Sequence, residues 1–181
     1  MSKTTEIICI LDRSGSMGTI MTEAMGALIS FVDEQKKLPG EANFTLVAFD
    51  DQYEVKYNKM PLAQVGHISF IEPRGMTALY DAIGKAVNSA ISAEKAIVLI
   101  QTDGQENSSR EYNNEKIKQL IADREKAGWQ FVFIGAGIDA FASGAAIGLS
   151  AQSCVNVAAS AEGMRAYGSV MDSNTSTYRA G

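Results

Sequence analysis

The chain has 181 residues, of which 46% are hydrophobic and 20% are charged. This composition fits a soluble globular protein and excludes fibrous and disordered classes. The net charge of -5 argues against nucleic acid and anionic membranes as main partners, because phosphate binding requires an excess of Lys and Arg on one surface.

The two cysteines and the hydropathy pattern predict a cytoplasmic location. Cys9 and Cys154 lie in apolar runs, which is typical of buried free thiols in a reducing compartment. The first six residues lack a signal-type apolar stretch, and no segment approaches the roughly 18 continuous apolar residues of a membrane span. We therefore expect neither export nor membrane insertion.

Apolar runs that predict strands alternate with segments of helical spacing along the chain. The expected strands are 7–11, 43–49, 53–57, 96–102, 131–134 and 153–157. The expected helices are about 18–37, 79–91 and 112–127, one between the last two strands, and one from about residue 159. The polar turn at 50–52 indicates a hairpin, so that strand 53–57 becomes an antiparallel edge strand.

This order predicts an α/β fold, a doubly wound and mostly parallel sheet with helices on both faces. We expect a single domain over residues 1–172. Residues 173–181 are polar and lack periodicity, so we expect a C-terminal tail that frays or is disordered.

The first strand is followed by oxygen side chains at alternating positions. Asp12, Ser14 and Ser16 are two residues apart, so in an extended chain they project to the same side. One carboxylate and two hydroxyls suit a hard divalent cation such as Mg²⁺ or Mn²⁺. Capping of the next helix is the alternative for one of these residues, but it does not explain the whole set.

Two further segments could complete such a site. Strand 96–102 ends at Asp103, and the carboxyl ends of neighbouring parallel strands meet at one edge of a sheet. Thr77 stands where the helix of residues 79–91 begins, and its hydroxyl either caps that helix or faces the ion. The sequence leaves these two roles of Thr77 open.

Together these segments resemble the metal-ion-dependent adhesion site of von Willebrand factor type A domains. The resemblance rests on Asp12-x-Ser14-x-Ser16, on Gly75-x-Thr77 and on Thr102-Asp103-Gly104, and it covers about residues 5–158. It implies a Rossmann-like sheet with strand order 3-2-1-4-5-6. It also implies that five residues surround Mg²⁺, some of them through water: Asp12, Ser14, Ser16, Thr77 and Asp103.

The function that this resemblance implies is a metal-dependent protein interaction module, not an enzyme, whose ion binds an Asp or Glu side chain of a protein partner. The short chain without a signal is similar to stand-alone intracellular A domains of bacteria and phages, for which AAA-type ATPases and other assemblies are associated partners. A metal-dependent hydrolase or phosphatase using Asp12 is one alternative, but the second Asp of dehalogenase-type phosphatases is replaced by Ser14. A passive structural subunit of a phage particle or ATPase assembly is the other.

Overall fold

The computed structural model of the chain describes residues 3–181. Its six strands are β1 (Thr5–Asp12), β2 (Ala42–Phe49), β3 (Tyr53–Pro61), β4 (Ala96–Thr102), β5 (Gln130–Ala136) and β6 (Cys154–Val157). Its α-helices are α1 (Met21–Lys36), α2 (Leu79–Ser89), α3 (Asn114–Lys126), α4 (Ala140–Ala146) and α5 (Ala161–Ala180). Three short 3₁₀ helices are η1 (Gly15–Thr19), η2 (Leu62–Gln64) and η3 (Ala151–Ser153).

The strands form one sheet in the order β3-β2-β1-β4-β5-β6, which confirms the expected doubly wound topology. Strand β1 lies between β2 and β4 and is parallel to both, and only β3 is antiparallel to its neighbour. Because β1 and β4 are adjacent, their carboxyl ends open at the same edge of the sheet. This adjacency is what a site shared by Asp12 and Asp103 requires.

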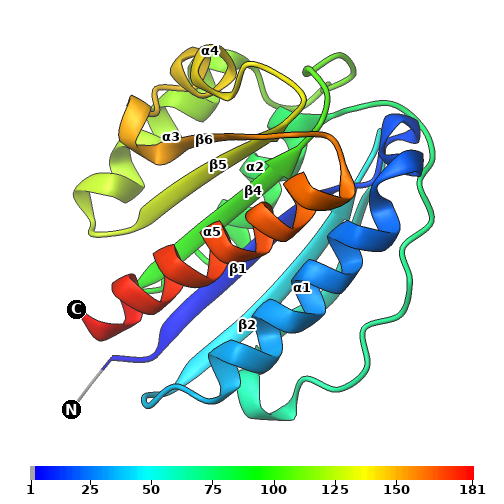
Figure 1. Cartoon of the computed structure of the whole chain (residues 1–181). Helices are drawn as coiled ribbons and strands as arrows, with labels where there is room; N and C mark the ends of the chain where they lie inside the picture. The colour runs from blue at the N-terminus through cyan, green and yellow to red at the C-terminus, as the bar shows by residue number, and fades with distance from the viewer. Residues whose placement is uncertain (1–2) are drawn as a thin grey trace.

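Helices cover both faces of the sheet, as Figure 1 shows. Alternate residues of β1 divide between two cores: Ile7, Cys9 and Leu11 pack with α1 and α5, whereas Ile8 and Ile10 pack with α2, α3 and α4. Both faces of the central strand are therefore buried, which explains why its sequence is apolar without alternation. None of the helices within residues 3–181 has the length and apolar character needed to cross a membrane.

The expected helix over 18–37 is divided into two parts. Residues Gly15–Thr19 form the 3₁₀ turn η1, and the regular helix α1 begins only at Met21. Glycines at positions 15 and 18 disfavour a longer α-helix at this point. The oxygen-bearing segment after β1 is therefore irregular only at residues 13–14, and Ser16 lies within the 3₁₀ turn and not in an extended chain.

The expectation of a C-terminal tail from residue 173 is wrong, because α5 continues to Ala180. Its buried side chains recur at helical spacing through Met171 and Thr175, and Thr175 was read from the sequence as part of a polar run. The end of the helix is fixed by Tyr178, whose hydroxyl donates to the Gly128 carbonyl at 2.8 Å and accepts from the Ala96 amide at 3.0 Å. These contacts join the last turn of α5 to the amino end of β4.

Candidate metal centre

Asp12, the last residue of β1, is completely buried, and both of its carboxylate oxygens are held. Oδ1 accepts the backbone N–H of Ser14 at 2.7 Å. Oδ2 accepts the hydroxyl of Thr102, the last residue of β4, at 2.7 Å. The register between β1 and β4 therefore fixes the orientation of this carboxylate. Thr102, which the sequence motif contains without an assigned role, is a supporting residue of the site.

A chain of hydrogen bonds joins the loop after β1 to the loop after β4. The hydroxyls of Ser14 and Ser16 lie 3.2 Å apart, and the Ser16 hydroxyl donates to Asp103 Oδ1 at 2.9 Å. Ser14 is buried, whereas Ser16 is exposed. The oxygen side chains thus run from the end of the sheet towards solvent.

Thr77 does not cap α2, which excludes one of the two roles that the sequence left open. The N-cap residue of α2 is Ala78. In the first turn of the helix, the backbone amide of Tyr80 donates to the Glu106 carboxylate at 3.2 Å. The Thr77 hydroxyl instead lies beside the loop after β4. A Cβ atom placed on Gly104 in that loop would be 3.5 Å from Thr77 Oγ1. Thr77 is buried, with its side chain at the same edge of the sheet as Asp103.

Asn107, which the sequence reading missed, holds the backbone of Thr77. The Thr77 amide donates to Asn107 Oδ1, and the Asn107 amide donates to the Thr77 carbonyl, both at 2.9 Å. The backbone of the loop after β1 is tied to the same region, because the Gly15 amide donates to the Gly75 carbonyl at 3.1 Å. Three loops thus bring the five predicted ligands to one end of the sheet.

The electrostatics of this end favour a cation. The pKa of Asp103 is raised to about 6, mainly by burial and also by the neighbouring negative charge of Asp12, against the hydrogen bond from Ser16. Two carboxylates that share one partly buried place repel each other in the absence of a positive charge. A divalent cation would remove that repulsion.

The donor set also decides which kind of metal fits. Within residues 3–181 there is no group of three or more His, Cys, Asp or Glu side chains that could hold a metal ion. The candidate centre has two carboxylates and three hydroxyls, all of them oxygen donors. Such a set suits a hard cation that retains some of its water, as Mg²⁺ does, better than a metal that prefers nitrogen or sulfur.

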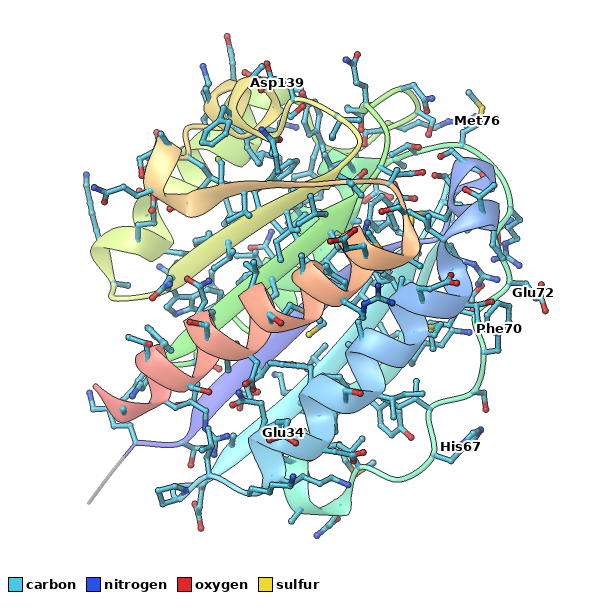
Figure 2. The ribbon with its side chains drawn as sticks, in the orientation of Figure 1. Glu34, His67, Phe70, Glu72, Met76 and Asp139 are labelled. Atoms are coloured by element: carbon cyan, nitrogen blue, oxygen red, sulfur yellow. The ribbon has the colours of Figure 1, made fainter. Side chains whose placement is uncertain are left out.

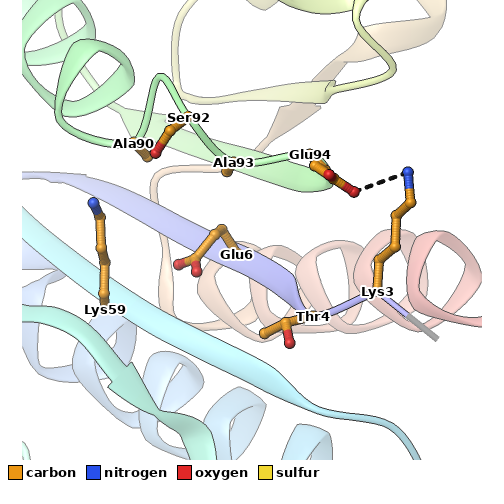
Figure 3. Close-up of a pocket in the computed structure, with 8 residues that line it drawn as sticks. All are labelled: Lys3, Thr4, Glu6, Lys59, Ala90, Ser92, Ala93 and Glu94. Carbon is orange, nitrogen blue, oxygen red and sulfur yellow. Dashed lines mark ion pairs between the residues drawn. The ribbon is translucent and has the colours of Figure 1, made fainter. Parts of the chain in front are cut away.

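A separate cavity of about 410 Å³ lies at the opposite end of the sheet (Figure 3). Its lining includes Lys3, Glu6, Lys59 and Glu94, and none of the five predicted metal ligands. Lys3 and Glu94 form an ion pair at 2.9 Å, and both side chains are largely exposed. The Lys3–Glu94 pair is open to water, whereas one carboxylate oxygen of Glu6 is buried without a hydrogen-bond partner among the described residues. The two lysines in the lining make this cavity a poor fit to a bare cation.

Comparison with known proteins places the fold. No protein-family model and no curated protein matches the chain. Among solved structures, proximal thread matrix protein 1 from the mussel byssus is similar over 98% of this chain, with a TM-score of 0.75 and 19% identity. A form of that protein described as having a zinc-occupied MIDAS motif is similar over 97%, with a TM-score of 0.73 and 18% identity.

The ArnB paralog VWA2 from Sulfolobus acidocaldarius is similar over 92% of this chain, with a TM-score of 0.62 and 21% identity. The chain spans about half the length of these proteins, at 47%, 46% and 44% respectively. The strand order, the single antiparallel edge strand and these similarities agree. The chain therefore has the fold of von Willebrand factor type A domains.

Proposed function

We propose that the chain is a divalent-metal-dependent interaction module that binds an acidic side chain of a protein partner. In this proposal Mg²⁺ is held by Asp12, Ser14, Ser16, Thr77 and Asp103, directly or through water. The ion supplies a positive charge that can accept a carboxylate ligand. The proposal is supported by a neighbour of the same fold whose MIDAS motif is described as zinc-occupied.

The observation that carries the proposal is the convergence of two carboxylates and three hydroxyls from three loops. Of the five residues, only Asp12 and Asp103 carry formal negative charge. The negative charge of the protein ligands would therefore not exceed the positive charge of a bound divalent cation. The ion would still attract an anionic oxygen, and such a charge-assisted bond is strong. The exposed Ser16 lies where solvent, and hence a partner side chain, can approach.

The arrangement favours binding over hydrolysis. Asp12 is the residue that a phosphatase mechanism would use as nucleophile, but its carboxylate is fully buried and both oxygens already accept hydrogen bonds. The one histidine of the sequence, His67, lies near the lower end of the coil after η2 in Figure 2, far from Met76, which immediately precedes Thr77. A general base at the centre would have to come from another group.

The proposed binding can be tested with a carboxylate probe before any partner is known. We expect millimolar acetate or a Glu-containing peptide to shift the amide NMR signals of Gly15, Ser16 and Thr77 in Mg²⁺. The same probe should leave them unchanged in EDTA. Identical shifts in both buffers would show that the carboxylate does not bind through a metal.

Affinity capture with the wild-type chain in Mg²⁺ and in EDTA, and with Asp12→Asn as matched bait, then identifies the partner. A protein that is retained only by the metal-loaded wild type, and whose own Asp→Asn or Glu→Gln variant is lost, supports the proposal. Capture that is equal under all three conditions favours a passive structural subunit instead. Hydrolysis of a phosphate ester that Asp12→Asn abolishes would favour the hydrolase.

A further inference from the structure

Four charged side chains form a cluster beside the candidate metal centre: Arg13, Asp50, Glu54 and Arg74. Arg13 Nη1 donates to Glu54 at 2.8 Å, and Arg74 Nε donates to Asp50 Oδ2 at 2.8 Å. Arg74 also contacts Glu54, which closes the cluster. Arg13 and Asp50 are almost completely buried.

The cluster joins the metal loop to the coil that carries Thr77. Arg13 stands between the predicted ligands Asp12 and Ser14, and its guanidinium donates twice to the Glu72 carbonyl, from Nε at 2.9 Å and from Nη2 at 2.6 Å. The Arg13 carbonyl in turn accepts the Arg74 amide at 2.7 Å. Side chain and backbone of Arg13 thus hold residues 72–74 against the loop after β1.

Asp50, in the turn between β2 and β3, holds the same coil on both sides of Thr77. Its side chain binds Arg74, and its carbonyl accepts the Ala78 amide at 2.8 Å. Between these two contacts Gly75 has φ +67°, and a Cβ there would overlap the carboxylates of Asp50 and Asp51. The turn and the coil are in such close contact that Thr77 has little freedom to move independently.

From this geometry we propose that Arg13, Asp50 and Arg74 are positioning residues of the metal centre. They hold Thr77 and the loop after β1 in fixed relative positions, so that the oxygen donors do not have to be ordered when the ion binds. The inference rests on the proposed function, since it concerns the same centre. It goes further by assigning the geometry of the centre to the β2–β3 hairpin, which contributes no ligand.

The charges of the cluster allow positioning to be separated from simple electrostatics. Two guanidinium groups and two carboxylates sum to zero, so the cluster adds no net charge near the ion. Removal of one arginine leaves an extra negative charge, which by Coulomb attraction alone would strengthen Mg²⁺ binding. If the arginine instead positions the ligands, its removal has the opposite effect and weakens Mg²⁺ binding.

Arg74→Gln is the decisive variant, because the Arg74 side chain is 44% exposed and belongs to neither apolar core. We expect the full chain with Arg74→Gln to bind Mg²⁺ about 10-fold more weakly, the lower end of the range for residues that support metal ligands. Lys56→Gln is the matched control. It removes one positive charge that pairs with Glu54 at 2.7 Å, but Lys56 bonds neither loop of the centre, so its affinity should be unchanged or slightly higher.

A double-mutant cycle tests whether Arg74 acts through Thr77. Thr77→Ala should itself weaken Mg²⁺ binding, and adding Arg74→Gln to it should change the affinity less than about 2-fold, since coupled residues are not additive. Equal 10-fold losses in both backgrounds would overturn the action of Arg74 through Thr77. So would unchanged or tighter Mg²⁺ binding by Arg74→Gln.

Calorimetric Mg²⁺ titrations should be made at a temperature where each variant is folded by circular dichroism. If Arg74→Gln lowers the melting temperature and leaves the Mg²⁺ affinity unchanged, the cluster is structural only and the inference is wrong. If the wild-type chain itself takes up no Mg²⁺, the proposed function fails as well. The two failures are therefore distinguished by the wild-type titration.

Discussion

The two ends of the sheet carry charge in opposite ways. At the carboxyl end, the Asp12 and Asp103 carboxylates lie next to each other and are partly shielded from solvent. Burial, together with the negative charge of Asp12, raises the pKa of Asp103 to about 6. At the amino end, Lys3 and Glu94 are 65% and 70% exposed and pair with each other in water (Figure 3). Like charges held together by the fold favour binding of a counter-ion, whereas opposite charges at the surface neutralise each other and contribute little to stability.

The largest expected effect is at the carboxyl end. Asp12→Asn keeps the shape of the side chain and removes its charge, so Mg²⁺ affinity should fall at least 100-fold, or about 2.7 kcal/mol. The metal-free protein should not lose stability, because the substitution also relieves repulsion with Asp103. Calorimetry measures the first effect and thermal unfolding in EDTA the second.

Glu94→Gln provides the matched control for Asp12→Asn, since it removes one carboxylate at the other end of the sheet. Its Mg²⁺ affinity should equal that of the wild type. A comparable loss in both variants would mean that the net charge of the protein, and not the centre, governs metal uptake.

At the amino end we expect an effect on stability alone. Tyr178→Phe removes the hydroxyl that bonds the Ala96 amide and the Gly128 carbonyl, which should cost about 1–3 kcal/mol of unfolding free energy. Urea unfolding measures this loss. Because α5 ends far from the metal loops, Mg²⁺ affinity should be unaltered, and a weakened affinity would show that the two ends are coupled.

The pKa of Asp103 predicts how metal binding depends on pH. Below about pH 6 the carboxyl binds a proton that Mg²⁺ must displace, so affinity should fall with decreasing pH by up to about 10-fold per unit. The raised pKa also means that the folded, metal-free protein binds more protons than the unfolded chain between about pH 4 and 6. Its stability should therefore decrease as pH rises through this window. Calorimetric titrations at pH 5, 6 and 7 measure the affinity, and constant affinity would contradict the shift.

The smallest effect is expected from the surface pair. Lys3→Gln breaks the ion pair with Glu94, and the free energy of unfolding should change by less than about 0.5 kcal/mol. Urea unfolding at low and at high salt is the measurement. A larger loss that salt abolishes would show that the amino end depends on this charge pair after all.

Much of the sheet and the meeting of Asp12 and Asp103 at one end of it could be predicted, because both follow from local patterns. Apolar runs mark the buried strands, and Asp12 and Asp103 stand at strand ends. The supporting contacts could not be predicted in the same way. The bond from Thr102 to Asp12 joins residues 90 positions apart and depends on strand register.

The wrong expectation of a C-terminal tail and the unexpected burial of Arg13 have a common physical cause. Thr175 and Tyr178 read as polar tail residues, although Thr175 is fully buried and Tyr178 bonds two backbone groups. Arginine side chains are usually solvated, but Glu54 and the Glu72 carbonyl satisfy the charge and donors of Arg13 in the interior. Tertiary partners of this kind leave no local signal in the sequence.

The most direct test of the account is a crystal structure of the full chain grown with Mn²⁺, with anomalous scattering used to locate the metal. Mn²⁺ shares the oxygen preference of Mg²⁺ and scatters strongly enough to be located. The account predicts one anomalous peak among Asp12, Ser14, Ser16, Thr77 and Asp103, and none in the cavity at the amino end. Absence of a peak at the carboxyl end at millimolar Mn²⁺, or a peak only elsewhere, would contradict it.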